Sequence, residues 1–128
     1  MKTVRVVSAV LLALPFLVFG GNYFLHFFPM PPGDGSSGDQ LLQAMRNGGL
    51  MAPVAFSHVV VAGFLLFPRT RFAGGLLQLP MSLGMVAFHA TMLPAGLVTA
   101  IPLLLFNVGV LADWPRLCAL FERNPAGT

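Results

Sequence analysis

Five polar side chains interrupt long apolar stretches of the sequence: Asn22, His26, His58, His89 and Asn107. Histidine titrates near neutral pH, donates hydrogen bonds and ligates metals. One or two histidines could hydrogen-bond a quinone, two facing histidines could hold a haem, and three could hold a metal ion. No H-x-x-x-H or E-x-x-H spacing supports a metal site. We therefore expect no metal, place a quinone ahead of a haem as the cofactor, and assign no catalytic residue.

The stretches that carry these residues have the composition of a membrane protein. Hydrophobic residues make up 56% of the 128 residues and charged residues only 9%, with a mean hydropathy of +0.82. A soluble domain usually carries about 25% charged residues, so most of this surface needs lipid rather than water. The net charge of +3 does not indicate nucleic-acid binding, because the basic residues form no patch or helical stripe.

Four uncharged stretches predict four helices that cross a membrane, each of which needs roughly 17–25 mostly apolar residues. The predicted helices cover residues 6–28, 50–67, 72–94 and 97–114, with Trp114 extending the last one as an interfacial anchor. The expected fold is all-α: a single membrane domain, 1–128, built as a four-helix bundle. Small residues should let these helices approach closely: Ala9, Ala13, Gly63, Gly75, Gly84 and Gly109.

The basic residues predict which side of the membrane each end occupies. An even number of crossings puts six of the seven on one side, which the positive-inside rule makes cytoplasmic. They are Lys2, Arg5, Arg69, Arg71, Arg116 and Arg123. Both termini are therefore expected inside, with Asp113 near the inner boundary paired with Arg116, Arg69 or Arg71. A cleaved signal peptide over the first apolar stretch is the alternative, although no A-x-A site follows it.

The outer loop between the first two helices predicts a short helix of its own. Pro29, Pro31 and Pro32 should end the first helix, because proline lacks the amide hydrogen. Ser37 and Gln40 have the spacing of a capping box, which favours a helix over residues 39–47. We expect this helix to lie at the membrane interface across the outer mouth of the bundle. An unstructured loop is the alternative.

The depth of each polar residue predicts one pocket in the outer half of the bundle. His58 lies roughly 12 Å along its helix at 1.5 Å per residue, and Asn107 enters about as deep. His26 and His89 lie near the outer ends of their helices. The five residues could therefore line one ligand pocket, although histidines that only hydrogen-bond neighbouring helices explain the pattern too. Gln78 and Ser82 form a polar stripe on the third helix, which we interpret as helix–helix contact rather than a pathway.

Several short motifs resemble those of the DoxX-like family in the same order. The run F-G-G-N-Y-F-L-H-F-F-P-M-P at residues 19–31 is similar to the end of that family's first helix. The amphipathic segment 39–49 resembles its extracytoplasmic helix, and A-G-F-L-L at 62–66 resembles the run before its basic inner turn. Phe88-His89, followed by Leu93-Pro94 and Gly96, resembles the outer end of its third helix.

The resemblance implies a small four-helix protein of the bacterial inner membrane. Some members are linked to quinone-coupled oxidation of thiosulfate, or to membrane complexes that handle oxidative and thiol stress. This chain departs from the family at Val59, where many relatives carry glutamate, and at Gly84, where they often have asparagine. Any proton-coupled activity would then have to be rebuilt around His58.

Two functions from different classes follow. The first is a redox-linked membrane subunit whose outer pocket binds a quinone. The second is a non-catalytic scaffold or accessory subunit, which would bind a protein partner or a second copy through the outer helix and the basic inner rim. A small transporter is a third possibility, but four helices are few for transport and no acidic residue lies at mid-depth.

Overall fold

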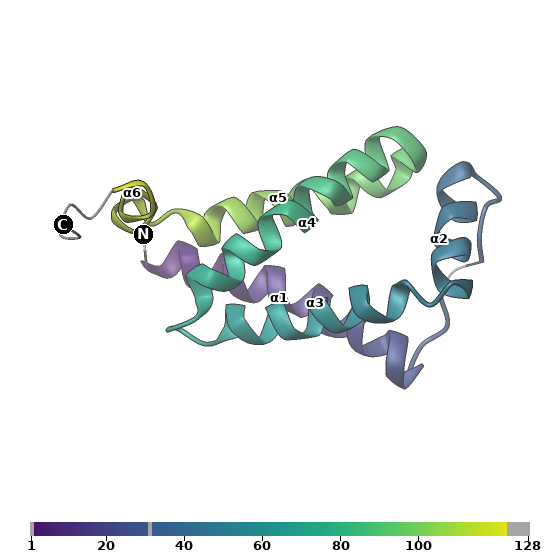
Figure 1. Cartoon of the computed structure of the whole chain (residues 1–128), viewed down its shortest axis with the longest axis horizontal. Helices are drawn as coiled ribbons and strands as arrows, with labels where there is room; N and C mark the ends of the chain where they lie inside the picture. The colour runs from purple at the N-terminus through teal and green to yellow at the C-terminus, as the bar shows by residue number, and fades with distance from the viewer. Residues whose placement is uncertain (1, 31, 123–128) are drawn as a thin grey trace, which may run out of the picture.

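The computed structural model describes residues 2–30 and 32–122, and these residues form helices and connecting turns without any strand (Figure 1). In chain order the helices are α1 (Lys2–Leu25), α2 (Ser37–Asn47), α3 (Met51–Leu66), α4 (Arg71–Met92), the short 3-10 helix η1 (Pro94–Gly96), α5 (Leu97–Leu111) and α6 (Trp114–Phe121). The all-helical class is confirmed.

The long helices lie alongside one another, and the short ones lie at the two ends. Helix α1 contacts α3 and α5, and α4 contacts the same two helices. Helix α2 crosses one end of this group, and α6 lies at the other end beside the N-terminus (Figure 1). We call these the α2 end and the α6 end. The apolar core between the long helices consists of Ala9, Leu12, Ala13, Phe16, Val61, Ala62, Leu65, Leu103 and Val110.

The distribution of side chains suits lipid. Phe56 and Leu105 are each 63% exposed, whereas the polar residues Gln78 and Asn107 are fully buried. Three helical segments are long and apolar enough to cross a membrane: α1, α4, and η1 with α5. Helix α3 has only 16 residues and qualifies only together with α2, from which it is bent by 91°. The described part of the chain thus holds three or four candidate spans.

Each contact between neighbouring long helices includes a glycine at a close approach. A Cβ atom on Gly20 of α1 would lie 2.9 Å from the carbonyl oxygen of Ala55 in α3. The corresponding glycines at the other three contacts are Gly74 (α4 against α3), Gly75 (α4 against α5) and Gly109 (α5 against α1). Gly63 and Gly84 were also expected at contacts, but a Cβ on either would meet nothing within 4 Å. That expectation is wrong for these two, because both face away from the neighbouring helices.

The first helix ends earlier than the prolines indicate. We expected 6–28, whereas α1 covers Lys2–Leu25. The amide of Asn22 closes the turn that follows: its Oδ1 accepts a hydrogen bond from Phe28 N at 2.9 Å, and its Nδ2 donates to Phe28 O at 3.0 Å. His26 occupies the left-handed region at φ +50. The chain therefore reverses before the first proline is reached.

The last predicted helix is divided in two. We expected one helix over 97–114, but α5 stops at Leu111 and α6 starts at Trp114. Pro115 lies in the first turn of α6, where its missing amide hydrogen costs nothing. Trp114 therefore begins a separate helix, which is amphipathic and exposes Trp114 and Phe121 at 74% and 84%.

The outer-loop helix begins with a cap one residue earlier than expected. The N-cap is Ser36 rather than Ser37, and its hydroxyl accepts a hydrogen bond from Asp39 N at 3.2 Å. The Asp39 carboxylate in turn accepts one from Gly35 N at 3.2 Å. Ser36 thus takes the capping role that we had assigned to Ser37, while its own amide donates to Asp34 rather than to the Asp39 side chain.

Candidate functional site

A pocket of about 660 Å³ opens at the α2 end, between α1, α3 and α2. We call it the histidine pocket. All three helices and the turn after α1 contribute polar side chains to the pocket, and its walls are mainly apolar. The lining residues are Phe19, Gly20, Asn22, Tyr23, His26, Phe28, Pro29, Met30, Arg46, Met51, Ala55 and His58.

His58 is held in this pocket by its neighbours in α1. Its ring stacks on Phe16, with centroids 4.7 Å apart and planes 11° from parallel. Gly20, one turn further along α1, lets α3 approach at this level, where a Cβ would lie 3.3 Å from His58 Cβ. Within residues 2–30 and 32–122, no protein group hydrogen-bonds the ring of His58. His58 thus lines the pocket without a hydrogen-bond partner among these residues.

His26 and Asn22 reach the pocket from the end of α1. His26 is exposed in the turn that follows the helix, and its left-handed backbone conformation is one that residues other than glycine adopt infrequently. Asn22 is only 3% exposed, and both atoms of its amide are engaged by Phe28. Asn22 therefore lines the pocket while its amide holds the following turn, and its expected role of orienting a ligand stays a prediction.

Two polar lining residues were not among those predicted from the sequence. Arg46 comes from the last turn of α2, and Tyr23 from the last turn of α1. The sequence offered a signal for Arg46, because it is the one basic residue predicted on the outer side of the membrane, the same side as the pocket. Together with the histidines, they give the pocket a guanidinium and a phenol as further hydrogen-bond donors.

His89 lies outside the histidine pocket. Its Nδ1 is 3.3 Å from the carbonyl oxygen of Leu93, and its ring meets Phe88 edge-on at 5.2 Å. It also packs against Gly96 of η1. His89 thus belongs to the turn that joins α4 to α5, and the structure does not bring it together with His26 and His58.

Asn107 also lies elsewhere, in the contact between α4 and α5. Its Nδ2 donates to the carbonyl oxygen of Gly75 at 2.9 Å. One helical turn along α4, Gln78 donates to Ser82 at 3.4 Å, and all three polar side chains are buried. Gln78 Oε1 and Asn107 Oδ1 have no hydrogen-bond partner among the described residues. The predicted polar stripe and Asn107 are therefore neighbours in one helix–helix contact.

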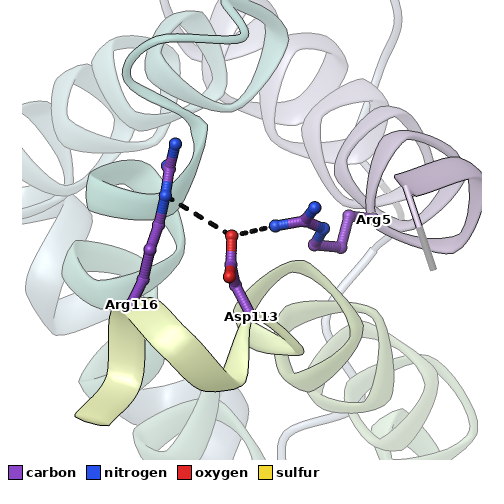
Figure 2. Close-up of polar contacts among 3 residues, drawn as sticks. All are labelled: Arg5, Asp113 and Arg116. Carbon is purple, nitrogen blue, oxygen red and sulfur yellow. Dashed lines mark hydrogen bonds and ion pairs between the residues drawn. The ribbon is translucent and has the colours of Figure 1, made fainter. Parts of the chain in front are cut away.

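The charged residues at the opposite end are also connected. Asp113 accepts a hydrogen bond from Arg5 of α1 and forms an ion pair with Arg116 of α6, whose Nε lies 3.4 Å from Asp113 Oδ2 (Figure 2). Arg116 was one of the expected partners, while Arg5 was not foreseen. Among residues 2–30 and 32–122, no three histidine, cysteine, aspartate or glutamate side chains lie close enough together to hold a metal ion.

Compared with known proteins, the chain matches no family model, no curated protein and no solved structure. The resemblance to DoxX-like proteins therefore stays a prediction from the sequence.

Proposed function

We propose that this chain is an integral membrane protein that crosses the bilayer four times, with α3 as the fourth crossing. Helix α3 is roughly 24 Å long at 1.5 Å per residue, somewhat short for a hydrocarbon core of about 30 Å. Phe56 and Phe64 on α3 are nevertheless exposed like the lipid-facing residues of the longer helices. A short span can be accommodated by local thinning of the bilayer.

The α6 end would be the cytoplasmic one, in a bacterial inner membrane. One pocket there is lined by Lys2, Arg5, Arg71 and Arg116, whereas Arg46 at the α2 end is accompanied by Asp34 and Asp39 around another pocket, of about 260 Å³. The positive-inside rule favours the basic end as cytoplasmic. The predicted inner residue Arg123 lies outside the described residues.

The proposed activity is that of a redox-linked subunit whose histidine pocket binds a quinone. The single observation that carries it is the placement of His58, Tyr23 and Arg46 around one pocket of about 660 Å³ with mainly apolar walls. Ligand pockets commonly measure about 300–1,000 Å³ and combine apolar walls with a few polar groups. A quinone has that complementary character, with an apolar ring and two carbonyl acceptors.

In this proposal each residue has a defined task. The N–H of the His58 ring and the guanidinium of Arg46 donate hydrogen bonds to the carbonyls. Phe19, Met30 and Ala55 supply apolar contacts and exclude water. When bound, a quinone supplies two-electron, two-proton redox chemistry. His26 lies at the exposed rim of the pocket.

The test compares two histidine substitutions in purified protein in detergent. A titration with short-chain ubiquinone and menaquinone should show binding that His58→Ala weakens about tenfold or more, since hydrogen bonds and packing are both lost. His89→Ala removes the same group outside the pocket and should leave the affinity unchanged.

Mass spectrometry of an organic-solvent extract should also recover quinone from the wild-type protein and less from His58→Ala. Lipid alone in the extract, with no binding in the titration, would refute the quinone proposal. A non-catalytic scaffold, which could dock a partner through the exposed Leu41 of α2, would then be the better explanation.

A further inference from the structure

A second, smaller pocket of about 220 Å³ lies at the α6 end. We call it the basic pocket. Half of its lining residues are cationic and the others are apolar, with no acidic residue among them. They are Lys2, Arg5, Val6, Pro68, Arg71, Phe72, Val110 and Arg116. A pocket with four cations and apolar walls is suited to an anion attached to an apolar body.

Among the described residues, one carboxylate pairs with these cations. Asp113 pairs with both Arg5 and Arg116, which approach it from α1 and α6 (Figure 2). Its side chain is 14% exposed and fixes where the two guanidinium groups lie. Arg116 also lies over the ring of Phe72 at 5.9 Å from the centroid. One carboxylate cannot neutralise four cations, so the pocket retains an excess of positive charge.

Helix N-termini add to this positive charge. Lys2 and Arg5 lie in the first turn of α1, Arg71 begins α4, and Arg116 lies in the first turn of α6. The first turn of a helix presents unbonded amide hydrogens and the positive end of the helix dipole. No acidic residue lies in the first turn of these three helices, and neither α4 nor α6 has a side-chain cap.

Helix α2 shows the contrast within the same chain. Its N-terminus is capped by Ser36 and carries Asp39 in the first turn. At the basic pocket, the carboxylate that could cap α6 is Asp113, and its side chain makes no capping hydrogen bond. Among the described residues, the N-termini of α4 and α6 therefore have no side-chain cap.

We propose that the basic pocket binds the phosphate group of an anionic phospholipid. Arginine guanidinium groups match phosphate oxygens in geometry and charge, and helix N-termini bind phosphate readily. Val6, Phe72 and Val110 give the pocket an apolar wall, and exposed apolar side chains continue from it along α1, including Val7 and Val10. A lipid fits this continuity, because its acyl chains would follow α1 while its phosphate meets the cations. The proposal rests on the membrane-spanning part of the proposed function and is independent of the quinone.

The test is native mass spectrometry of the full chain released from nanodiscs of phosphatidylcholine with a minor share of phosphatidylglycerol. We expect one phosphatidylglycerol to be retained per chain. Arg116→Gln should lower the retained fraction about fivefold. The double substitution Lys2→Gln with Arg116→Gln should lower it further, because each basic residue near an anionic lipid contributes a similar share of the binding free energy. Arg69→Gln is the matched control: Arg69 lies in the turn between α3 and α4 but does not line the pocket.

The outcomes separate the possible explanations. An equal loss in Arg69→Gln and Arg116→Gln would overturn the proposal, because a general charge effect would then explain the binding. If inorganic phosphate displaces the lipid at equal concentration, the lipid assignment falls and the site belongs to the free ion. Quinone affinity measured on the same variants should not change, since the two pockets lie at opposite ends. A lost lipid with an unchanged quinone affinity would therefore support the lipid site without bearing on the quinone.

Discussion

The ring of His58 lies parallel to the ring of Phe16 at a centroid distance of 4.7 Å. Phe16 is 4% exposed and belongs to the apolar core, so one face of the imidazole is covered by a residue that cannot move freely. The stack turns a flexible side chain into a fixed one. Its hydrogen-bonding edge is thereby oriented before any ligand arrives.

Replacing Phe16 tests this orientation. Phe16→Leu keeps an apolar side chain in the core but removes the stack, which we expect to be worth about 0.5–1.5 kcal/mol. Quinone affinity should fall about two- to tenfold while His58 itself is intact. Phe24→Leu is the control, because Phe24 is exposed and does not line the pocket. An unchanged affinity in Phe16→Leu would show that the stack does not position the imidazole.

Asn22→Ala should destabilise the α2 end. The substitution removes two hydrogen bonds to the backbone of Phe28, each worth about 0.5–1.5 kcal/mol. We expect unfolding in an SDS titration to become easier by about 1–3 kcal/mol. Asn47→Ala makes the same chemical change at an exposed position and should shift stability by less than about 0.5 kcal/mol. Equal effects of the two would count against the role assigned to Asn22.

Gly20→Ala and Gly63→Ala should have opposite consequences. A Cβ on Gly20 meets the backbone oxygen of Ala55 at 2.9 Å, whereas one on Gly63 meets nothing within 4 Å. The first should cost about 1–3 kcal/mol through overpacking. The second should be neutral or stabilising by up to about 1 kcal/mol through helix propensity. Thermal melting in detergent measures both, and a stable Gly20→Ala protein would mean that α1 and α3 separate at little cost.

Asp113→Asn should loosen the α6 end. It removes the carboxylate that joins Arg5 to Arg116, and hydrogen bonds to charged groups contribute about 1.5–3 kcal/mol. The melting temperature of Asp113→Asn in detergent should therefore be clearly lower than that of the wild type. Glu122→Gln neutralises an exposed acid that forms no ion pair among the described residues and should have little effect. In a double-mutant cycle, Arg5→Gln should cost much less in the Asp113→Asn background.

The turn before α2 should respond to acid. The hydroxyl and backbone amide of Ser36 hydrogen-bond the Asp34 carboxylate and lower its pKa below the ordinary 3.8. A lowered folded pKa stabilises the turn above pH 3.8, and this contribution is lost as pH falls through the folded pKa. NMR titration of the Asp34 carboxyl carbon in micelles should give a midpoint below 3.8. Ser36→Ala should move the midpoint upward, and a wild-type midpoint above 3.8 would contradict the assignment.

Much of the helical framework could be predicted from the sequence. Uncharged apolar runs predict long helices because an unpaired backbone group is costly in lipid. The division between α5 and α6 was missed because Trp114 was interpreted as an anchor, although Asp113 and Pro115 around it are typical of a helix start. The apolar run that ends at Trp114 favoured one continuous helix over the start that Asp113 and Pro115 indicate.

The site was harder to predict, for a geometric reason. Sequence distance along a helix indicates depth in the membrane, and depth alone grouped His58, His89 and Asn107. The direction in which a side chain leaves its helix axis depends on how the helices are rotated against one another. That rotation follows from contacts such as Gly75 with Val110, which no periodicity in a single helix reveals. Asn107 also bonds Gly75 near the α6 end of α4, whereas His58 stacks on Phe16 further toward the α2 end, so the two residues share neither a depth nor a pocket.

The ion pair between Arg5 and Asp113 joins residues 108 positions apart, and this separation has a consequence for biosynthesis. Arg5 leaves the ribosome long before Asp113, which follows only after α5 has been made. Until then the guanidinium must be satisfied by water or by lipid phosphates at the membrane surface. The contact that joins α1 to the junction of α5 and α6 is thus a late event of assembly, and a chain truncated before residue 113 could insert its helices but not complete this closure.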